Sequence, residues 1–345
     1  MTAPDLLNDM LKDVSRSFYL TLRVLPGSIR RPIGLAYLLA RTTDTIADTE
    51  LVPVEDRLVA LEALRDRILG GPGATLDFSR FEVAVPGQPS AGSGRASQDP
   101  ERVLLRRNDE ALRALDELTP LDRQLVRDVL ATITSGQVLD LRRFATASAD
   151  RIVALSSDAE LEDYTYRVAG CVGEFWTRMC RAHLFPDGPV DDTFLRRNGV
   201  RFGQGLQLVN ILRDLPRDLR QGRCYLPAER LAQGGLSPAQ LLDPAAIEGF
   251  RPLYLEYVTH AEGLLADGWA YTNALPRKQA RVRLACALPI LIGVKTLRRL
   301  RDGNVLDASR RIKISRAEVR RLMLALVWCY PRPRAWEGLF ARAQN

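Results

Sequence analysis

NILRDLPRDL, residues 210–219, is the stretch that decides the fold class, because it has the pattern of an apolar helix carrying two aspartates one turn apart. Pro216 stands between Asp214 and Asp218, where a helix loses the backbone hydrogen bond to Leu212 and tends to kink. We therefore predict that the helix bends outward near Asp218 and that Asp214 is the better placed carboxylate. Helix stability alone does not explain why such a pair is present.

Helical periodicity dominates the whole chain. Apolar residues recur at three- and four-residue spacing in segments 33–48, 54–69, 101–117, 121–142, 160–184, 192–215, 253–274, 279–300 and 316–330. Convincing alternating strands are absent. The pattern predicts an all-α fold, a single domain over residues 1–345 whose helices surround a core or a cavity.

One segment breaks the helical pattern. Residues 70–100 are rich in Gly, Pro and Ser, a composition typical of loops. We predict a long surface loop here, with a short extended piece at FEVAV, residues 81–85. The helices on either side are too few to form separate cores, so we do not interpret the loop as a domain linker.

The net charge of +7 comes almost entirely from arginine, with 45 Arg against 4 Lys. The base composition of a GC-rich genome explains such a bias, and so would a nucleic acid, an anionic membrane or a polyanionic substrate as partner. No helix-turn-helix, zinc-finger or RNP-like motif accompanies the charge, and the arginines are spread along the chain. We therefore expect no specific binding to nucleic acid.

The cysteines and the apolar runs indicate the cellular compartment and whether the chain can span a membrane. Five cysteines lie far apart without a CxxC pair, and two histidines are too few for a typical zinc site. No signal segment opens the chain, so we expect a reducing, cytoplasmic compartment. The longest apolar runs, 284–294 and 322–330, fall short of the roughly 20 residues of a spanning helix. Residues 330–345, with Trp336 and Phe340, could lie at a membrane interface or pack against the protein.

Two stripes of polar side chains lie on otherwise apolar helices. The first consists of Tyr37, Arg41, Asp44 and Asp48, and the second of Gln207, Asn210, Asp214 and Asp218. Solvated faces of amphipathic helices are the ordinary explanation of such patterns. However, like charges one turn apart repel each other, and amides join the second stripe. Paired carboxylates and amides are hard oxygen ligands that suit Mg²⁺ shared with substrate phosphates. The stripes therefore favour ionisation of a diphosphate ester in an apolar cavity.

Four motifs together resemble the squalene/phytoene synthases, the head-to-head branch of the trans-isoprenyl diphosphate synthases. They are VSRSF (14–18), ARTTDTIAD (40–48), YRVAGCVGE (166–174) and QLVNILRDLPRDLRQGRCYLP (207–227). The likeness extends over about residues 12–330. It implies an all-α isoprenoid synthase fold with a central cavity in which two prenyl diphosphates are joined.

The resemblance also assigns roles to residues. The implied magnesium ligands are Asp44, Asp48, Asn210, Asp214 and Asp218. The implied substrate-binding residues are Ser15, Arg16, Ser17, Phe18, Arg41, Gln207, Asn210, Arg213 and Arg223. Tyr166 would stand near the cationic intermediates. Gly170 and Gly173 would either make room for a prenyl chain or allow close helix packing.

Within the C-terminal third, residues 287–322 resemble the corresponding segment of the squalene synthases, whereas the carotenoid-forming relatives usually differ there. In that family a late basic stretch is associated with the NADPH phosphates, which makes Lys313 and Arg316 candidates for cofactor binding; Ser315 stands where a second basic residue is expected. A basic turn on the surface is the alternative. The implied activity is squalene synthesis from two farnesyl diphosphates through presqualene diphosphate. A phytoene, dehydrosqualene or hydroxysqualene synthase, which transfers no hydride, is the runner-up, and a noncatalytic assembly factor on the same fold is a distant third.

Overall fold

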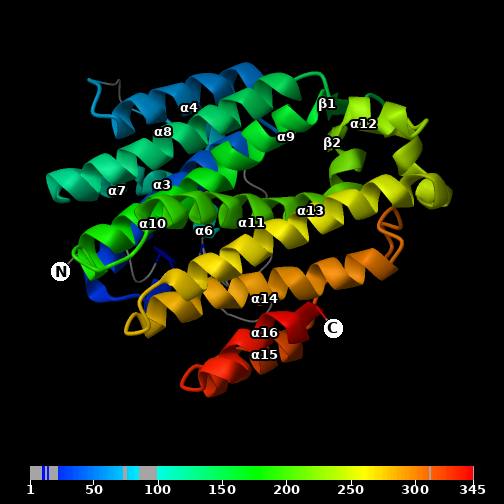
Figure 1. The fold of residues 1–345 in the computed structure, drawn as a ribbon. Coiled ribbons are helices and arrows are strands. Elements are labelled where there is room, and N and C mark those ends of the chain that lie inside the picture. Colours follow the sequence, from blue (N-terminus) through cyan, green and yellow to red (C-terminus); the bar gives the residue numbers. More distant parts are fainter. Residues whose placement is uncertain are drawn as a thin grey trace, which may run out of the picture. The chain divides into compact units, whose positions relative to one another are not determined.

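The structure is a computed structural model that describes residues 10–11, 14, 22–72, 76–84, 99–310 and 312–344. Helices account for nearly all of its regular structure (Figure 1), which confirms the all-α prediction. Ser15, Arg16, Ser17 and Phe18 lie outside the described residues, so the proposal that they bind substrate remains a prediction. Contacts group the chain into two compact units, Met1–Ala145 with Arg178–His183, and Thr146–Thr177 with Leu184–Asn345. The single-domain assignment also stays a prediction.

The first unit is built around one long helix. Its elements are α3 (Gly27–Asp48), α4 (Val54–Ile68), α5 (Ser79–Ala84), α6 (Pro100–Arg106), α7 (Asn108–Asp116) and α8 (Pro120–Arg143). Helix α3 packs against α4, α7 and α8, and the apolar side chains Leu38, Leu39 and Ile46 of α3 are completely buried. Thr119 begins α8 as a cap, because its side chain accepts a hydrogen bond from the backbone N–H of Asp122.

The second unit is larger. Its elements are β1 (Val153–Leu155), α9 (Asp158–Thr165), the π-helix η1 (Tyr166–Gly170), α10 (Cys171–Leu184), α11 (Asp192–Arg220), β2 (Arg223–Pro227), α12 (Ala228–Gln233), the 3₁₀-helices η2 (Pro238–Leu242) and η3 (Pro244–Ala246), α13 (Ile247–Ala274), α14 (Ala280–Asp302), α15 (Arg316–Cys329) and α16 (Pro333–Gln344). Residues Arg178–His183 of α10 are grouped with the first unit and the rest of that helix with the second. Helix α11 packs against α13, α13 packs against α14, and α15 and α16 pack on α14 (Figure 1).

Several boundaries differ from the predictions. Residues 79–84 form helix α5, so the extended piece expected at FEVAV was wrong for the residues that the structure describes. Two short strands form a parallel pair, with Val153 opposite Arg223; three and five residues are too few to show alternation. The segment predicted as one helix over 101–117 divides at Arg107 into α6 and α7.

Glycines allow α10 and α11 to approach closely in the second unit. A Cβ atom on Gly173 would stand 1.8 Å from the carbonyl oxygen of Gly199, a distance that no side chain tolerates. A Cβ atom on Gly170 would stand 3.1 Å from side-chain atoms of Tyr166 and Gln204. Close helix packing is therefore the observed reason for glycine at position 173, and a side chain at position 170 would be tightly packed against Tyr166 and Gln204.

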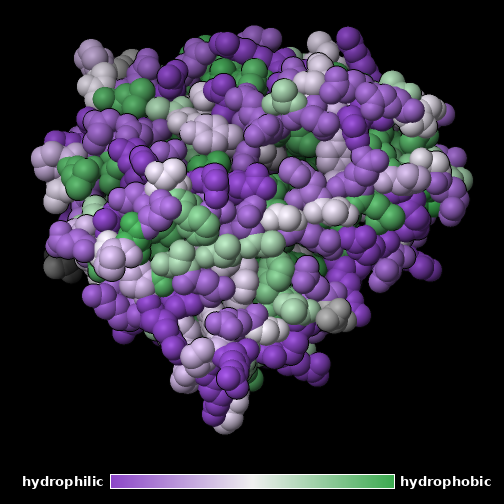
Figure 2. Space-filling model, in the orientation of Figure 1, coloured by the Kyte–Doolittle hydropathy of each residue, from purple (hydrophilic) through white to green (hydrophobic). Residues whose placement is uncertain are grey.

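The surface and the cysteines complete the description. Hydrophilic residues cover most of the face drawn in Figure 2, and apolar residues appear between them. All five cysteines are buried free thiols. Within the described part of the chain, no helix is both long and apolar enough to cross a membrane.

Candidate active site

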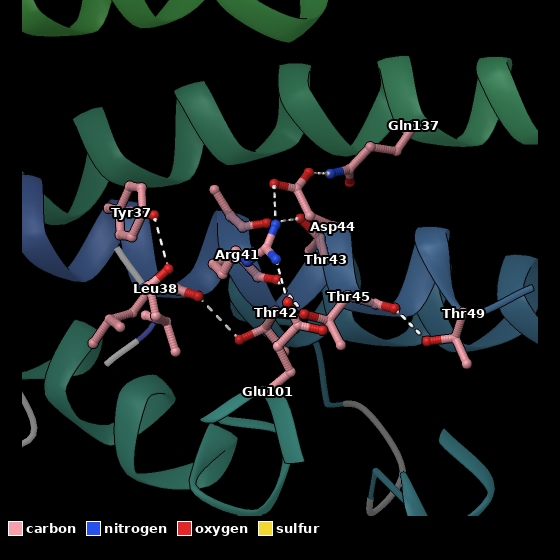
Figure 3. Close-up of polar contacts among 12 residues, drawn as sticks. Tyr37, Leu38, Arg41, Thr42, Thr43, Asp44, Thr45, Thr49, Glu101 and Gln137 are labelled. Carbon is pink, nitrogen blue, oxygen red and sulfur yellow. Dashed lines mark hydrogen bonds and ion pairs between the residues drawn. The ribbon is translucent and has the colours of Figure 1, made fainter. Parts of the chain in front are cut away.

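The first aspartate motif lies on the last turns of α3, within the first unit (Figure 3). The side-chain amide of Gln137 on α8 donates a hydrogen bond to Asp44 Oδ1 at 2.6 Å. Arg41 Nη1 lies 4.0 Å from Asp44 Oδ2, and Arg41 Nη2 also pairs with Glu101 at the start of α6. The Arg41 guanidinium thus bridges two carboxylates, and both Arg41 and Asp44 are held in place by neighbouring helices.

The environment of Asp44 disfavours its charged form. Its side chain keeps 46% of its surface exposed, but the protein around the rest raises its pKa to about 6. Desolvation is the main cause and the charge of Asp48 the second, while Arg41 and the hydrogen bond from Gln137 lower the pKa. A nearby cation would relieve both unfavourable effects. This behaviour is expected of a carboxylate pair that binds a metal ion.

Threonine hydroxyls allow the same helix to bury polar residues. Thr42 donates to the carbonyl of Leu38 at 3.0 Å, and Thr45 donates to the carbonyl of Arg41 at 2.9 Å. These bonds satisfy the hydroxyls inside the helix, so both threonines are buried. The Asp44 carboxylate instead lies near Arg41 on its own helix and accepts a hydrogen bond from Gln137 on α8, and part of its surface stays open to solvent.

The second aspartate motif lies on α11, within the second unit. Arg213 donates from Nε to Asp214 Oδ1 at 2.9 Å and from Nη2 to Oδ2 at 2.5 Å. This two-point hydrogen bond raises the pKa of Arg213, and the charges of Asp214 and Asp218 raise it further. Both aspartates therefore lie near one guanidinium. Each Asp214 oxygen accepts one hydrogen bond from Arg213, which leaves further lone pairs that could bind a metal.

Helix α11 continues through Pro216 to Arg220. Proline has no N–H, so the carbonyl of Leu212 loses its helical partner. The phenol of Tyr254, on α13, donates to that carbonyl at 3.1 Å. Leu212 is 0% exposed and Tyr254 is 1% exposed. A buried side chain on the adjacent helix thus replaces the hydrogen bond that proline removes, and the α-helix extends beyond the end at residue 215 that we predicted.

The remaining residues of the predicted second stripe also lie on α11. Asn210 is exposed, Gln207 and Asp218 are half-buried, and Arg223 begins β2 just after α11 ends. Between them Gly222 has a φ of 78°, a conformation that favours glycine. Burial raises the pKa of the Cys224 thiol, and the charge of the nearby Asp218 raises it further, so Asp218 lies close to the strand that Arg223 begins.

Tyr166 opens the π-helix η1, where the sequence predicted an ordinary helix. Inserted π-turns occur often at functional sites. The close approach of two helices at Gly173, a few residues further along the chain, is an alternative reason for the altered winding. Desolvation, followed by the charge of Glu174, raises the pKa of the Tyr166 phenol. A phenol with a raised pKa stays protonated at neutral pH, so Tyr166 is suited to orient a cation rather than to act as a base.

Arg316 is the first residue of α15 and Lys313 precedes it by three residues; both are exposed. Ser315, where a basic residue was expected, begins the helix as its cap. Its hydroxyl donates to Glu318 Oε2 at 2.8 Å and accepts from the Glu318 N–H at 3.2 Å. This capping box explains the serine by helix formation.

The fit to magnesium rests on the donor set. The described residues contain no single cluster of three or more His, Cys, Asp or Glu side chains that could hold a metal. Each unit instead supplies one aspartate pair, on α3 and on α11. Beside Asp44, the buried Oε1 atom of Gln137 has no hydrogen-bond partner in the described structure. Carboxylate and amide oxygens with an unused acceptor fit a hydrated Mg²⁺.

Sequence reasoning missed three residues that act on these motifs. Gln137 contacts Asp44, Glu101 contacts Arg41, and Tyr254 contacts the backbone beside Asp214. The sequence contained a usable signal for Gln137, because a side-chain amide in the otherwise apolar segment 121–142 needs a polar partner inside the protein. Glu101 and Tyr254 carry no comparable signal, because only tertiary packing brings them to their partners.

The chain is similar to known proteins over most of its length. The sequence profile described as squalene/phytoene synthase matches residues 11–318. A 15-cis-phytoene synthase from Synechocystis is 28% identical over 317 residues, which cover 88% of this chain and 79% of that protein. A presqualene diphosphate synthase from Zymomonas mobilis is 28% identical over 222 residues, covering 64% and 60%. A bifunctional lycopene cyclase/phytoene synthase from Blakeslea trispora is 25% identical over 295 residues, and the match spans only 43% of its length.

Solved structures share the fold. A complex of TcSQS with the ligand E5700 superposes with a TM-score of 0.71 at 20% identity, covering 98% of this chain and 96% of that one. The squalene synthase HpnC from Alicyclobacillus acidocaldarius superposes with a TM-score of 0.57 at 19% identity, covering 92% and 93%. These likenesses confirm the isoprenoid synthase fold.

Proposed function

Because the chain belongs to the squalene/phytoene synthase family, we propose that it is a prenyltransferase-type enzyme that joins two prenyl diphosphates head to head. The observation that carries this proposal is the Asp44–Asp48 pair, in which one carboxylate has a pKa raised to about 6 by desolvation and by its neighbour. A helix gains no stability from such a pair, whereas a cation bound to a diphosphate would be held by it.

The proposed metal ligands are Asp44, Asp48, Asn210, Asp214 and Asp218, as the sequence predicts. Magnesium held there would supply charge neutralisation for a departing diphosphate. Arg41 and Arg213 each hold a carboxylate, so both guanidiniums are positioned to exchange that partner for diphosphate oxygens. Arg223 is the third proposed diphosphate ligand. Ser15, Arg16, Ser17, Phe18 and Gln207 complete the proposed substrate-binding set.

The proposed reaction begins when the C1–O bond of one prenyl diphosphate breaks and diphosphate leaves. The double bond of the second substrate attacks C1, and loss of a proton closes a cyclopropane ring. Tyr166, whose pKa is raised by desolvation, keeps its proton and orients the cation through its oxygen. The released diphosphate is then the base that takes the proton.

We propose squalene as the final product, with NADPH bound near Lys313 and Arg316 as hydride donor. Both side chains are exposed, one just before α15 and one at its first residue, so a dinucleotide could reach them. A phytoene or presqualene diphosphate synthase is the second candidate, because the relatives from Synechocystis and Zymomonas mobilis carry those names. Neither of these alternatives needs a hydride donor.

Product analysis separates these candidates. The purified chain is incubated with farnesyl diphosphate and Mg²⁺, with and without NADPH, and the extracted products are identified. Squalene that forms only with NADPH, with presqualene diphosphate accumulating without it, supports squalene synthesis. Presqualene diphosphate that accumulates regardless of NADPH, or turnover of geranylgeranyl diphosphate alone to phytoene, supports the second candidate. Dehydrosqualene or hydroxysqualene would instead support the other synthases without hydride transfer that the sequence also suggests. No turnover of either substrate would overturn the proposal and revive the noncatalytic assembly factor.

We also propose a cytoplasmic location with peripheral contact to a membrane. The five buried free thiols fit a reducing compartment. Trp336 and Phe340, the aromatic residues considered for an interface, instead stack on Trp269 with ring centroids 5.2 and 5.9 Å away. A different surface must therefore make such a contact.

A further inference from the structure

Helix α15 presents an apolar face that no other described part of the second unit covers. Leu324, Val327 and Trp328 are 72%, 64% and 70% exposed. They are spaced three and one residues apart, so they lie on one face of the helix. The other exposed large apolar side chains of the described residues are Val24, Leu51, Val59, Leu69, Leu121 and Val172, which are spread over several elements. Only α15 gathers three.

The apolar face continues into a shallow depression beside α16. The depression has a volume of about 1090 Å³, and its lining includes Leu324, Trp328, Leu339 and Arg342. Arg332 covers part of Trp328, with its guanidinium carbon 4.6 Å from the ring centroid, and donates to the Trp328 carbonyl at 2.6 Å. Trp328 therefore combines an exposed ring with an adjacent positive charge.

Cations surround this face. Side chains of residues 313–344 include Lys313 and six arginines but only two carboxylates, Glu318 and Glu337. Glu318 is neutralised by an ion pair with Arg299 at 2.7 Å. Arg320 and Arg321, both exposed, precede Leu324 by four and three residues and so extend the same face. With seven basic and two acidic side chains, residues 313–344 carry a net charge of +5 of the chain's +7, and Arg332 and Arg342 lie directly beside the apolar side chains.

We propose that the face formed by Arg320, Arg321, Leu324, Val327, Trp328 and Arg332, here called the α15 face, docks on the surface of an anionic phospholipid bilayer. Leu324, Val327 and Trp328 would enter the boundary between headgroups and acyl chains, where tryptophan is favoured. The arginines would contact lipid phosphates, each strengthening binding about fivefold. This inference rests on the proposed peripheral membrane contact, for which it names the surface, and it does not depend on the proposed reaction.

Vesicle binding tests the proposal without any substrate. The full chain is sedimented with vesicles of phosphatidylcholine alone or mixed with phosphatidylglycerol, at low and high salt. We expect binding to the anionic vesicles only, and weaker binding at high salt. Trp328 is the exposed tryptophan among the four, so its emission should shift to shorter wavelength on binding, and Trp328→Phe should abolish the shift.

Two variants and a matched control separate the α15 face from general surface effects. The combined changes Leu324→Ser, Val327→Ser and Trp328→Ser remove the apolar contact, and we expect a loss on the order of 100-fold or more. Arg320→Gln with Arg321→Gln should weaken anionic binding about 25-fold. Leu51→Ser with Val59→Ser, at residues 76% and 68% exposed, should leave binding unchanged.

Three outcomes would overturn the proposal. They are equal binding by the triple serine variant and the unchanged chain, equal binding to neutral and anionic vesicles, and no vesicle binding at all. In the last case, self-association that the triple variant abolishes would make the α15 face a contact between copies of the chain. Because the altered side chains are exposed, unchanged melting temperatures should show that every variant is folded.

Discussion

Replacing Tyr254 by phenylalanine tests how the chain tolerates a proline between its paired aspartates. The change removes one hydroxyl and leaves the ring, so it creates almost no cavity. It deprives the buried Leu212 carbonyl of the donor at 3.1 Å, and an unsatisfied buried acceptor costs about 1–3 kcal/mol. Because Pro216 offers no N–H, the helix cannot supply another donor at that position.

The second change in the cycle is Pro216→Ala. Alanine restores an N–H that can donate to the Leu212 carbonyl, so in this background Tyr254→Phe should cost less than about 0.5 kcal/mol. The predicted coupling energy is therefore about 1–3 kcal/mol. Pro216→Ala alone should be neutral or stabilising, since proline inside a helix is unfavourable.

Urea unfolding followed by tryptophan fluorescence gives the free energies of the four chains. Trp269 lies on α13 with Tyr254, so its signal reports the relevant part of the second unit. Tyr271→Phe is the matched control, because its hydroxyl is also buried but accepts from Thr177 at 3.1 Å. Its cost should be the same with proline or alanine at position 216. Equal costs of Tyr254→Phe in both backgrounds would refute the reasoning.

Three other substitutions have outcomes that the structure predicts. The pKa of Asp44 is raised to about 6 in the folded chain, against about 3.9 in the unfolded chain, so the folded state binds more protons between these pH values and its stability falls as the pH rises through them. In metal-free buffer at pH 7, Asp44→Asn should therefore melt at a higher temperature than the unchanged chain. A difference in melting temperature that is equal at every pH would contradict this. Gly173→Ala places a Cβ atom 1.8 Å from the Gly199 carbonyl oxygen and should lower the free energy of unfolding by about 3 kcal/mol or more. The control Gly263→Ala, whose Cβ atom would have nothing within 4 Å, should stabilise α13 by about 0.5–1 kcal/mol. Urea unfolding measures both changes, and similar effects of the two variants would disprove the packing role of Gly173. Ser315→Ala removes the cap of α15 and should cost about 1 kcal/mol in the same assay, while restoration by Asp at that position would separate loss of the cap from loss of a serine-specific contact.

The spacing of apolar residues predicted the helices that carry the site, because a helix that buries one face must place apolar residues on that face every three to four positions. Asp44 and Asp214 lie on long helices, α3 and α11, as their apolar spacing requires. The π-helix that begins at Tyr166 was not predictable, because five residues of altered winding leave the surrounding apolar pattern unchanged. The strand pair that includes Arg223 is likewise too short to show alternation.

The partners of the motif residues could not be predicted, because they come from distant parts of the chain. Gln137 reaches Asp44 across 93 residues, and Tyr254 reaches Leu212 across 42. The prediction that Pro216 removes a hydrogen bond needed only the chemistry of proline. The replacement of that bond depends on how α13 packs on α11, which no local pattern encodes.

Magnesium-dependent release of diphosphate from farnesyl diphosphate, or from geranylgeranyl diphosphate, tests the central claim most directly. The unchanged chain should release diphosphate only when Mg²⁺ is present. Asp44→Asn and Asp214→Asn, one change in each aspartate motif, should each lower the rate on the order of 10²–10³-fold, while Leu51→Ser, at an exposed residue outside both motifs, should not. Release that persists without Mg²⁺, or at the full rate in either aspartate variant, would contradict the account.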